Sequence, residues 1–170
     1  MSKIIFVSGI HGVGKGTLCR SLKELVGYPI YACSDLIKEN SSYIESGKVV
    51  SNAEKNQLAL LAGLNKITED VILLDGHFCL VGKDEQVIEL SYETFDAIKP
   101  AKIVNVTCDE TIVNERLKAR DGDALSVETL RSLQVAECHR AQNFASSRSI
   151  PLINFESGSD VNELLSWITA

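Results

Sequence analysis

The chain has 170 residues, of which 45% are hydrophobic and 24% are charged, and its formal net charge at pH 7 is −6. This length and balance are typical of one soluble globular domain of ordinary size. The acidic balance and the lack of a local lysine and arginine cluster exclude a sequence-independent grip on nucleic acid, which needs a basic face. No apolar stretch is long enough to span a membrane, and the first strand-like run leaves no room for a signal peptide, so we expect a cytoplasmic protein.

The cysteines are odd in number, widely spaced, and form no Cys-x-x-Cys pair. They are Cys19, Cys33, Cys79, Cys108 and Cys138. Because several of them lie inside apolar runs, we expect buried free thiols rather than a metal or redox site.

Strand-like apolar runs alternate with helical patterns from end to end, which predicts an α/β fold with a five-stranded parallel sheet and helices on both faces. The β-branched residues come in unbroken series, as a sheet that is buried on both faces requires. The expected strands are Lys3–Ser8, Ile30–Cys33, Val71–Asp75, Lys102–Thr107 and Pro151–Asn154. The expected helices are Lys15–Val26, Asp35–Asn40, Asn52–Thr68, Tyr92–Ile98, Glu110–Arg120, Val127–Arg148 and Asp160–Ile168. No repeat or linker divides the chain, so we expect a single domain over residues 1–170.

The first expected strand runs directly into the loop Gly9-Ile-His-Gly-Val-Gly-Lys-Gly-Thr17, which opens the first expected helix. This order is typical of a phosphate-binding loop, the P-loop or Walker A motif. Its glycines let successive backbone N–H groups converge on an anion at the positive end of the helix. Lys15, expected to face solvent, adds a charge for the β- and γ-phosphates. The candidate nucleotide-binding residues are Gly9, His11, Gly12, Val13, Gly14, Lys15, Gly16 and Thr17.

Gly16 occupies the position where most phosphate loops carry the Ser or Thr that ligates Mg²⁺. The resulting Gly-Lys-Gly-Thr ending resembles that of the nucleoside monophosphate kinases, adenylate kinase among them. This resemblance implies a three-layer P-loop fold and an ATP-dependent kinase activity. It also implies that Mg²⁺ is held largely by phosphates and water, and that Thr17 serves the α-phosphate side of the nucleotide.

The next informative stretch, Ser34-Asp35-Leu36-Ile37-Lys38, follows the second expected strand. It resembles the Gly-Asp-Met-Leu-Arg segment that begins the monophosphate-binding region of this kinase family. Lys38 replaces the arginine, so the charge remains while the bidentate geometry is lost. The resemblance implies that Asp35 and Lys38 bind the acceptor, within an insertion over residues 34–68 in which Gln57 is a further candidate. A helix that simply covers the sheet explains the second half of this region equally well.

A carboxylate, Asp75, ends the apolar run Val71-Ile-Leu-Leu, and Gly76 and His77 follow it. The carboxyl ends of strands are where open α/β sheets bind ligands, so Asp75 is placed to hold a metal-bound water or to orient the attacking group. The alternative is a strand-ending aspartate that starts a turn.

The Asp-x-His arrangement resembles the archaeal-type adenylate kinases and their eukaryotic nuclear relatives, which implies a catalytic role for Asp75 and His77 and a metal role for Asp75. A lone histidine is otherwise more often structural. The common adenylate kinases carry Asp-Gly-Phe-Pro-Arg here, and their arginine grips the acceptor phosphate. This chain has Cys79 near that position and no arginine after it.

Arg116 and Arg120 are four residues apart and therefore share a helix face. They match the Arg-x-x-x-Arg pattern at the start of the lid in the adenylate kinases, which implies that Arg116 lies against the adenine and that Arg120 contacts the transferring phosphates. A short lid over residues 120–126 follows, without the cysteines of zinc-bearing lids, so no structural metal is expected. The family supplies further lid arginines from the region that follows, so the resemblance implies that Arg131 and Arg140, on the next expected helix, are further substrate-binding candidates. A solvated, charged helix end is the alternative for Arg116 and Arg120.

These features together indicate an ATP- and Mg²⁺-dependent phosphotransferase that acts on a nucleoside monophosphate resembling AMP. Two alternatives stay open. One is a small-metabolite kinase of the shikimate or gluconate kind, in which the acceptor is a hydroxyl and Asp35 acts as its base. The other is a nucleotide-dependent switch ATPase that acts through a partner. The expected ligand beside ATP is a small-molecule acceptor, and the sequence does not indicate the oligomeric state.

Overall fold

The computed structural model describes residues 1–41 and 52–170 and contains a five-stranded parallel sheet with strand order β2-β3-β1-β6-β7. Its strands are β1 (Lys3–Ser8), β2 (Ile30–Ala32), β3 (Val71–Gly76), β6 (Lys102–Thr107) and β7 (Leu152–Glu156). The predicted sheet is thus confirmed. β1 lies at its centre because its run from Ile4 to Val7 is apolar throughout, and each of these side chains is at most 2% exposed.

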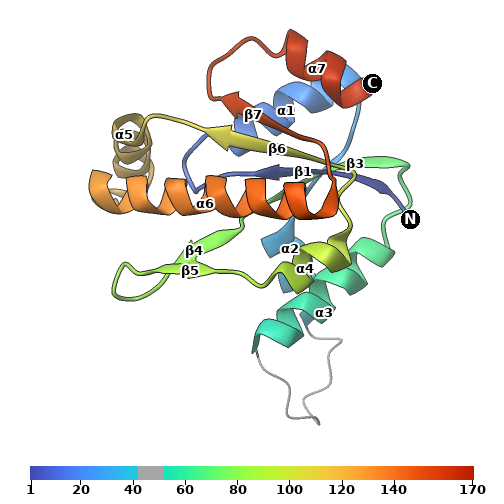
Figure 1. The fold of residues 1–170 in the computed structure, drawn as a ribbon, viewed down its shortest axis with the longest axis horizontal. Coiled ribbons are helices and arrows are strands. Elements are labelled where there is room, and N and C mark those ends of the chain that lie inside the picture. Colours follow the sequence, from blue (N-terminus) through green and yellow to red (C-terminus); the bar gives the residue numbers. More distant parts are fainter. Residues whose placement is uncertain (42–51) are drawn as a thin grey trace.

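Helices cover both faces of this sheet, with α1 and α7 on one side and the long α6 on the other (Figure 1). The helices are α1 (Lys15–Val26), α2 (Cys33–Asn40), α3 (Asn52–Asn65), α4 (Tyr92–Ile98), α5 (Glu110–Asp121), α6 (Val127–Arg148) and α7 (Asn162–Thr169). The bounds of α1, α4 and α6 agree with the prediction. α2 begins two residues early, at Cys33, because the chain turns into the helix directly after Ala32, whose backbone is still extended.

A two-stranded antiparallel hairpin, β4 (Cys79–Val81) and β5 (Val87–Glu89), was not predicted. Each strand has three residues, which is too short for an alternating pattern to stand out in the sequence. Figure 1 shows that the hairpin lies outside the main sheet and against α6. Its position matters because β4 continues directly from the segment that follows Asp75 and His77.

A cluster of aromatic rings fills the core between the sheet and α6. Phe78 is at its centre, with its ring centroid 4.2 Å from that of Phe95, 5.4 Å from that of Phe6 and 5.8 Å from that of Phe144. Tilted and edge-on aromatic pairs add to the stabilisation that burial provides. Phe78 is therefore firmly held, one residue after His77.

The cysteines are free thiols, as expected, and three of them are buried while Cys33 and Cys138 are half-buried. Burial raises the pKa of Cys19, Cys33 and Cys79 to about 12, so these groups stay protonated at neutral pH.

The expected acceptor insertion, residues 34–68, contains α2 and α3, and its residues 42–51 lie outside the described part of the chain. The two helices pack closely: a Cβ at Gly63 would lie 3.0 Å from the Cβ of Leu36. α2 begins directly after the carboxyl end of β2 and contacts β2 and β3. As to membranes, none of the helices in residues 1–41 and 52–170 is both long and apolar enough to cross one.

Candidate functional site

Strand pairing brings the glycine loop and the segment after β3 together at one edge of the sheet. Asp75 pairs with Val7 of β1 on one side and with Ala32 of β2 on the other, and Gly76 pairs with Ser8. Because all of these strands are parallel, their carboxyl ends open on the same crevice. The loop over residues 9–14 and the Asp75–His77 segment are therefore neighbours, as the sequence predicted for Asp75.

The glycine loop has a backbone that other residues would not adopt easily. Gly9 has a φ of 153°, and a Cβ there would lie 2.7 Å from the carbonyl oxygen of Val106. Val13 is fully buried and ties the loop to the core. Gly14, with a φ of 103°, precedes α1 and offers no capping side chain. The first N–H groups of α1 are thus left to an external acceptor, and a helix start of this kind suits an anion.

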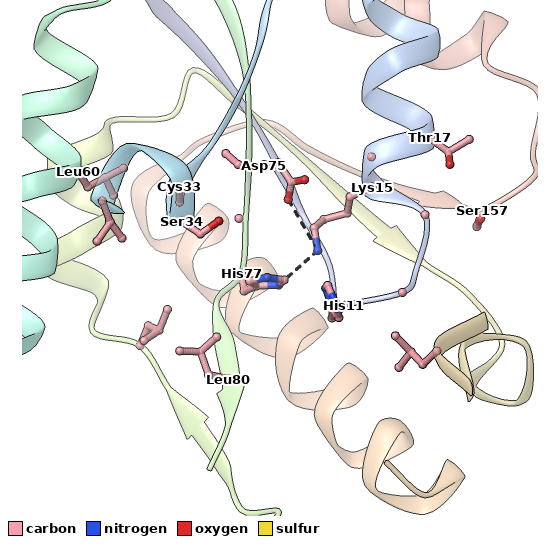
Figure 2. Close-up of a pocket in the computed structure, with 18 of the residues that line it drawn as sticks. His11, Lys15, Thr17, Cys33, Ser34, Leu60, Asp75, His77, Leu80 and Ser157 are labelled. Carbon is pink, nitrogen blue, oxygen red and sulfur yellow. Dashed lines mark hydrogen bonds and ion pairs between the residues drawn. The ribbon is translucent and has the colours of Figure 1, made fainter. Parts of the chain in front are cut away.

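Lys15 is buried, with only 6% of its surface exposed, and this corrects the expectation that it faces solvent. Its ammonium donates to the carbonyl oxygen of Gly9 at 2.6 Å and of Ile10 at 3.3 Å, because the loop curls over the first turn of α1. It also lies 3.8 Å from a carboxylate oxygen of Asp75 (Figure 2). Burial lowers the pKa of Lys15 and raises that of Asp75, and the attraction between the two opposes both shifts.

His77 reaches back to the glycine loop (Figure 2). Its Nδ1 lies 2.7 Å from the carbonyl oxygen of Gly9 and 3.3 Å from Nζ of Lys15. A single nitrogen cannot donate to the carbonyl and accept from Lys15 at once, so we assign the proton to Nδ1, which donates over the shorter distance. Burial first, and then the charge of Lys15, lower the pKa of His77 to about 4. The imidazole is therefore neutral at pH 7, with Nε2 as an acceptor.

Two arginines of α5 lie against the outer side of the loop. Nη1 of Arg116 is 3.4 Å from the carbonyl oxygens of Gly12 and Val13 and 3.5 Å from Oγ of Ser157. Arg120 contacts Nε2 of His11 and is paired with its chain neighbour, Asp121. The structure thus brings both arginines to the glycine loop.

One cavity of about 760 Å³ connects these groups, a volume in the range of small-molecule sites. Its glycine-loop end carries the basic side chains Lys15, Arg20, Arg116 and Arg120. Its other end, called the α2–α4 end below, is lined by Ser34, Ile37, Leu60, Leu90, Thr94, Phe95 and Ile98. Asp75 and His77 lie between the two ends (Figure 2). The α2–α4 end has no basic side chain among the lining residues that the structure describes.

The predicted acceptor residues do not line this cavity. Asp35 and Lys38 are exposed, and α2 instead turns Ser34 and Ile37 toward the cavity. Other residues of the same helix therefore line the cavity, and the rotation of the helix decides which of its residues face inward.

The later arginines are also absent from the cavity lining. Arg140 forms an ion pair with Glu89 at 3.4 Å, donates to the carbonyl oxygen of Leu90, and lies 3.9 Å from the centre of the Tyr92 ring. It therefore fastens the hairpin end to α6. Arg131 is exposed on α6.

Glu137 is a site-adjacent residue that the sequence reasoning missed. It is only 1% exposed, and its two carboxylate oxygens accept from the N–H groups of Phe78 and Cys79, both at 2.7 Å. A signal was present, since Glu137 lies four residues from both Leu133 and Ala141, two buried members of the apolar face of α6.

Comparison with known proteins gives consistent results. The family model described as "AAA domain" matches residues 8–133. UMP-CMP kinase 3 of Oryza sativa subsp. japonica is 28% identical over 162 residues, which cover 82% of this chain and 74% of that protein. Adenylate kinase isoenzyme 1 of Sus scrofa is 39% identical over 74 residues, which cover 42% of this chain and 38% of that one.

Solved structures share the fold. A gluconokinase from Sinorhizobium meliloti 1021 superposes with a TM-score of 0.53 at 13% identity, over 97% of this chain and 87% of that chain. TT1252 from Thermus thermophilus superposes with a TM-score of 0.55 at 16% identity, over 99% of this chain and 95% of that chain. At such identities the likeness concerns the fold alone.

Proposed function

This chain is a P-loop kinase of the AAA domain family, and we propose that it transfers the γ-phosphate of ATP to a nucleoside monophosphate. The observation that carries the proposal is that one continuous cavity joins a basic glycine-loop end to an apolar α2–α4 end, with Asp75 and His77 between them. Such a cavity can hold a phosphate donor and an organic acceptor face to face. UMP-CMP kinase 3, which this chain matches over most of its length, supports the choice of acceptor.

The donor site fits ATP and Mg²⁺. In the described part of the chain, no cluster of three or more His, Cys, Asp or Glu side chains could hold a metal ion, and Gly16 offers no side-chain oxygen. Mg²⁺ usually keeps several waters and binds through substrate phosphates and one or two carboxylates. Among the cavity-lining residues that the structure describes, Asp75 carries the carboxylate. When bound, it neutralises charge on the β- and γ-phosphates. Asp75 would hold its water shell, and Thr17 would face the α-phosphate side.

The protein's own contribution to the transfer is positioning and charge neutralisation. Lys15 and the loop N–H groups bind the phosphates of ATP. Arg120 neutralises charge on the group in transit, and Arg116, beside Ser157, lies against the adenine. His77 fixes the carbonyl of Gly9 and hence the loop.

Four candidates outside the cavity lining complete the proposal. Lys38 is exposed on α2 and follows the lining residue Ile37 by one position, and in this proposal its long side chain attracts the acceptor phosphate from outside the cavity, together with Asp35. Arg131 and Arg140 would join only if α6 and the segment before it move toward the cavity. Arg140 would then have to give up its contacts with Glu89 and Leu90.

A hydroxyl-bearing metabolite is the second candidate acceptor. The absence of a basic side chain from the described lining of the α2–α4 end favours it, because an acceptor without a phosphate needs no cation there. Ser34 and Thr94 are the hydroxyl groups that could orient it.

The test is ADP release from ATP with UMP, CMP, AMP, gluconate or shikimate added one at a time, against a sample without acceptor. A monophosphate that raises the rate at least tenfold supports the proposal. If only gluconate or shikimate raises the rate, the protein is instead a small-metabolite kinase. A rate that no acceptor changes would point to a switch ATPase instead.

A further inference from the structure

Glu137 is a buried carboxylate near the site to which the proposed reaction assigns no role. Its side chain projects from α6 toward the start of β4, and no lysine or arginine of the described chain forms an ion pair with it. A buried carboxylate is costly unless several hydrogen bonds compensate for lost water. Here the compensation comes first from two consecutive backbone N–H groups, those of Phe78 and Cys79. Burial raises the pKa of Glu137, and these N–H groups, the charge of Lys15 and the backbone of Gly9 oppose that rise.

These two hydrogen bonds fix the chain directly after His77. On the other side of His77, Gly76 is held in the sheet opposite Ser8, and a Cβ at Gly76 would lie 2.8 Å from the Phe6 ring. The backbone on both sides of His77 is therefore held in place, by the pairing of β3 before it and by the hydrogen bonds to Glu137 after it. A shift of the His77 backbone would break hydrogen bonds on one side or the other.

The position of His77 in turn determines contacts in the glycine loop. Its Nδ1 is 2.7 Å from the carbonyl oxygen of Gly9, the same oxygen that accepts from Nζ of Lys15 at 2.6 Å. A displaced imidazole would release this carbonyl and change where Lys15 points. The chain of contacts runs from Glu137 through the backbone of Phe78 to His77, Gly9 and Lys15.

We propose that Glu137 is a positioning residue, which holds His77 against the Gly9 carbonyl and so keeps Lys15 aligned for phosphoryl transfer. The inference rests on the proposed function only in taking ATP as the phosphate donor. A purely structural role would instead fasten β4 to α6. Phe78 is already held by its aromatic neighbours, so fastening alone does not require a carboxylate.

The experiment compares Glu137→Gln, His77→Ala and the double variant in the full chain. Glutamine keeps one acceptor oxygen and presents an NH₂ group to the second N–H, so it cannot satisfy both. We expect the kcat of ADP release to fall at least tenfold in each single variant. KM for ATP should rise by a smaller factor than kcat falls, because Lys15 keeps its charge and loses only its alignment. The double variant should be no slower than His77→Ala, because both changes act through one imidazole. Glu128→Gln, an exposed carboxylate on the same helix, is the control and should keep the wild-type rate.

Three results would overturn the proposal: a wild-type kcat in Glu137→Gln, a wild-type kcat in His77→Ala, or losses that multiply in the double variant. Glu137→Asp, which keeps the charge but shortens the reach, serves as the second variant and should also lose rate. If neither Glu137 variant folds by circular dichroism, the residue is a requirement of the fold and the positioning role is rejected. The rates are measured both with UMP and without acceptor. If the acceptor assignment is wrong, UMP will not raise the rate of ADP release in the wild-type protein. The effect of the Glu137 variants on the rate without acceptor is measured separately from this.

Discussion

Replacing Lys15 with alanine tests the donor site without any assumption about the acceptor. The ammonium donates to the carbonyls of Gly9 and Ile10 and lies beside Asp75, so its loss affects the protein before nucleotide is added. Leaving buried carbonyls unpaired costs on the order of 1–3 kcal/mol. Burial lowers the pKa of Lys15, which means that the charged ammonium is destabilised in the folded protein. Removing this charge therefore offsets part of the cost of the unpaired carbonyls. Each variant must therefore be compared with its own nucleotide-free form.

The expected loss of ATP binding is larger than this background. One hydrogen bond to a charged phosphate oxygen contributes about 1.5–3 kcal/mol, and about 3 kcal/mol corresponds to roughly a hundredfold in affinity. ATP at about 100 times its Kd stabilises the wild-type protein by about 2.7 kcal/mol. The same concentration would equal the Kd of the variant and give about 0.4 kcal/mol. For a domain of this size the shift in Tm should fall from about 5–10 °C to about 1–2 °C.

Thermal unfolding with and without ATP measures this shift directly. Lys23→Ala is the matched control, since Lys23 lies on the same helix, is exposed, and should leave the ATP-induced shift intact. An equal shift in wild-type protein and Lys15→Ala would refute the assignment of Lys15 to the phosphates. It would also mean that the contacts with Gly9 and Ile10 only support the fold.

Four further outcomes can be checked. Asp75→Asn should lower the single-turnover rate at least tenfold while ATP affinity, followed over a Mg²⁺ titration, changes little, because the shape of the side chain is kept and its charge is removed. Little change in both the rate and the affinity would mean that Asp75 is only a turn residue. Arg120→Lys should slow turnover about tenfold, because an ammonium cannot span two phosphate oxygens; a wild-type rate would place Arg120 on the solvated side of α5. Lys38→Ala should raise the apparent KM for UMP severalfold with ATP affinity unchanged, and no change in either would remove Lys38 from the acceptor site. Because the folded-state pKa of His77 is about 4, the unfolded chain takes up a proton first as pH falls through 6.5, so this group's contribution to stability is lost between pH 6.5 and 4. The free energy of unfolding of His77→Gln should fall less steeply over that window than that of the wild type, and parallel pH curves would contradict the neutral imidazole.

The parts of the fold that the sequence predicted are those with strong local signals. β1, the glycine loop and α1 follow from an unbroken apolar run, glycines at fixed offsets, and Gly27 closing α1 with a φ of 75°. Long elements such as α6 are identified by their length alone. The hairpin of β4 and β5 was not predicted, because each strand is only three residues long and is stabilised by its contacts with α6.

Side-chain direction was less predictable than position in the chain. Lys15 reads as a loop residue in the sequence, but the curl of the loop buries it under the carbonyls of Gly9 and Ile10. On α2 the resemblance pointed to Asp35 and Lys38, whereas Ser34 and Ile37 are the residues of this helix that line the cavity. Consecutive residues on a helix point about 100° apart, so a resemblance that identifies the segment does not determine which of its side chains face inward.

The distribution of charge in the cavity constrains how an acceptor can be recognised. All basic side chains of its described lining lie toward the glycine loop, while Leu60, Leu90, Phe95 and Ile98 line the α2–α4 end. A phosphate on the acceptor must then share the cations that serve ATP, or draw on Lys38 at the rim. If the cations are shared, the same arginines contact the phosphates of ATP and the phosphate of the acceptor. Each arginine then neutralises charge on both sides of the transferred group, so transfer is favoured only when ATP and the acceptor are both bound. The apolar end would contribute affinity for the organic part of the acceptor, and selectivity among UMP, CMP and AMP would depend on Ser34 and Thr94, the hydroxyl groups at that end.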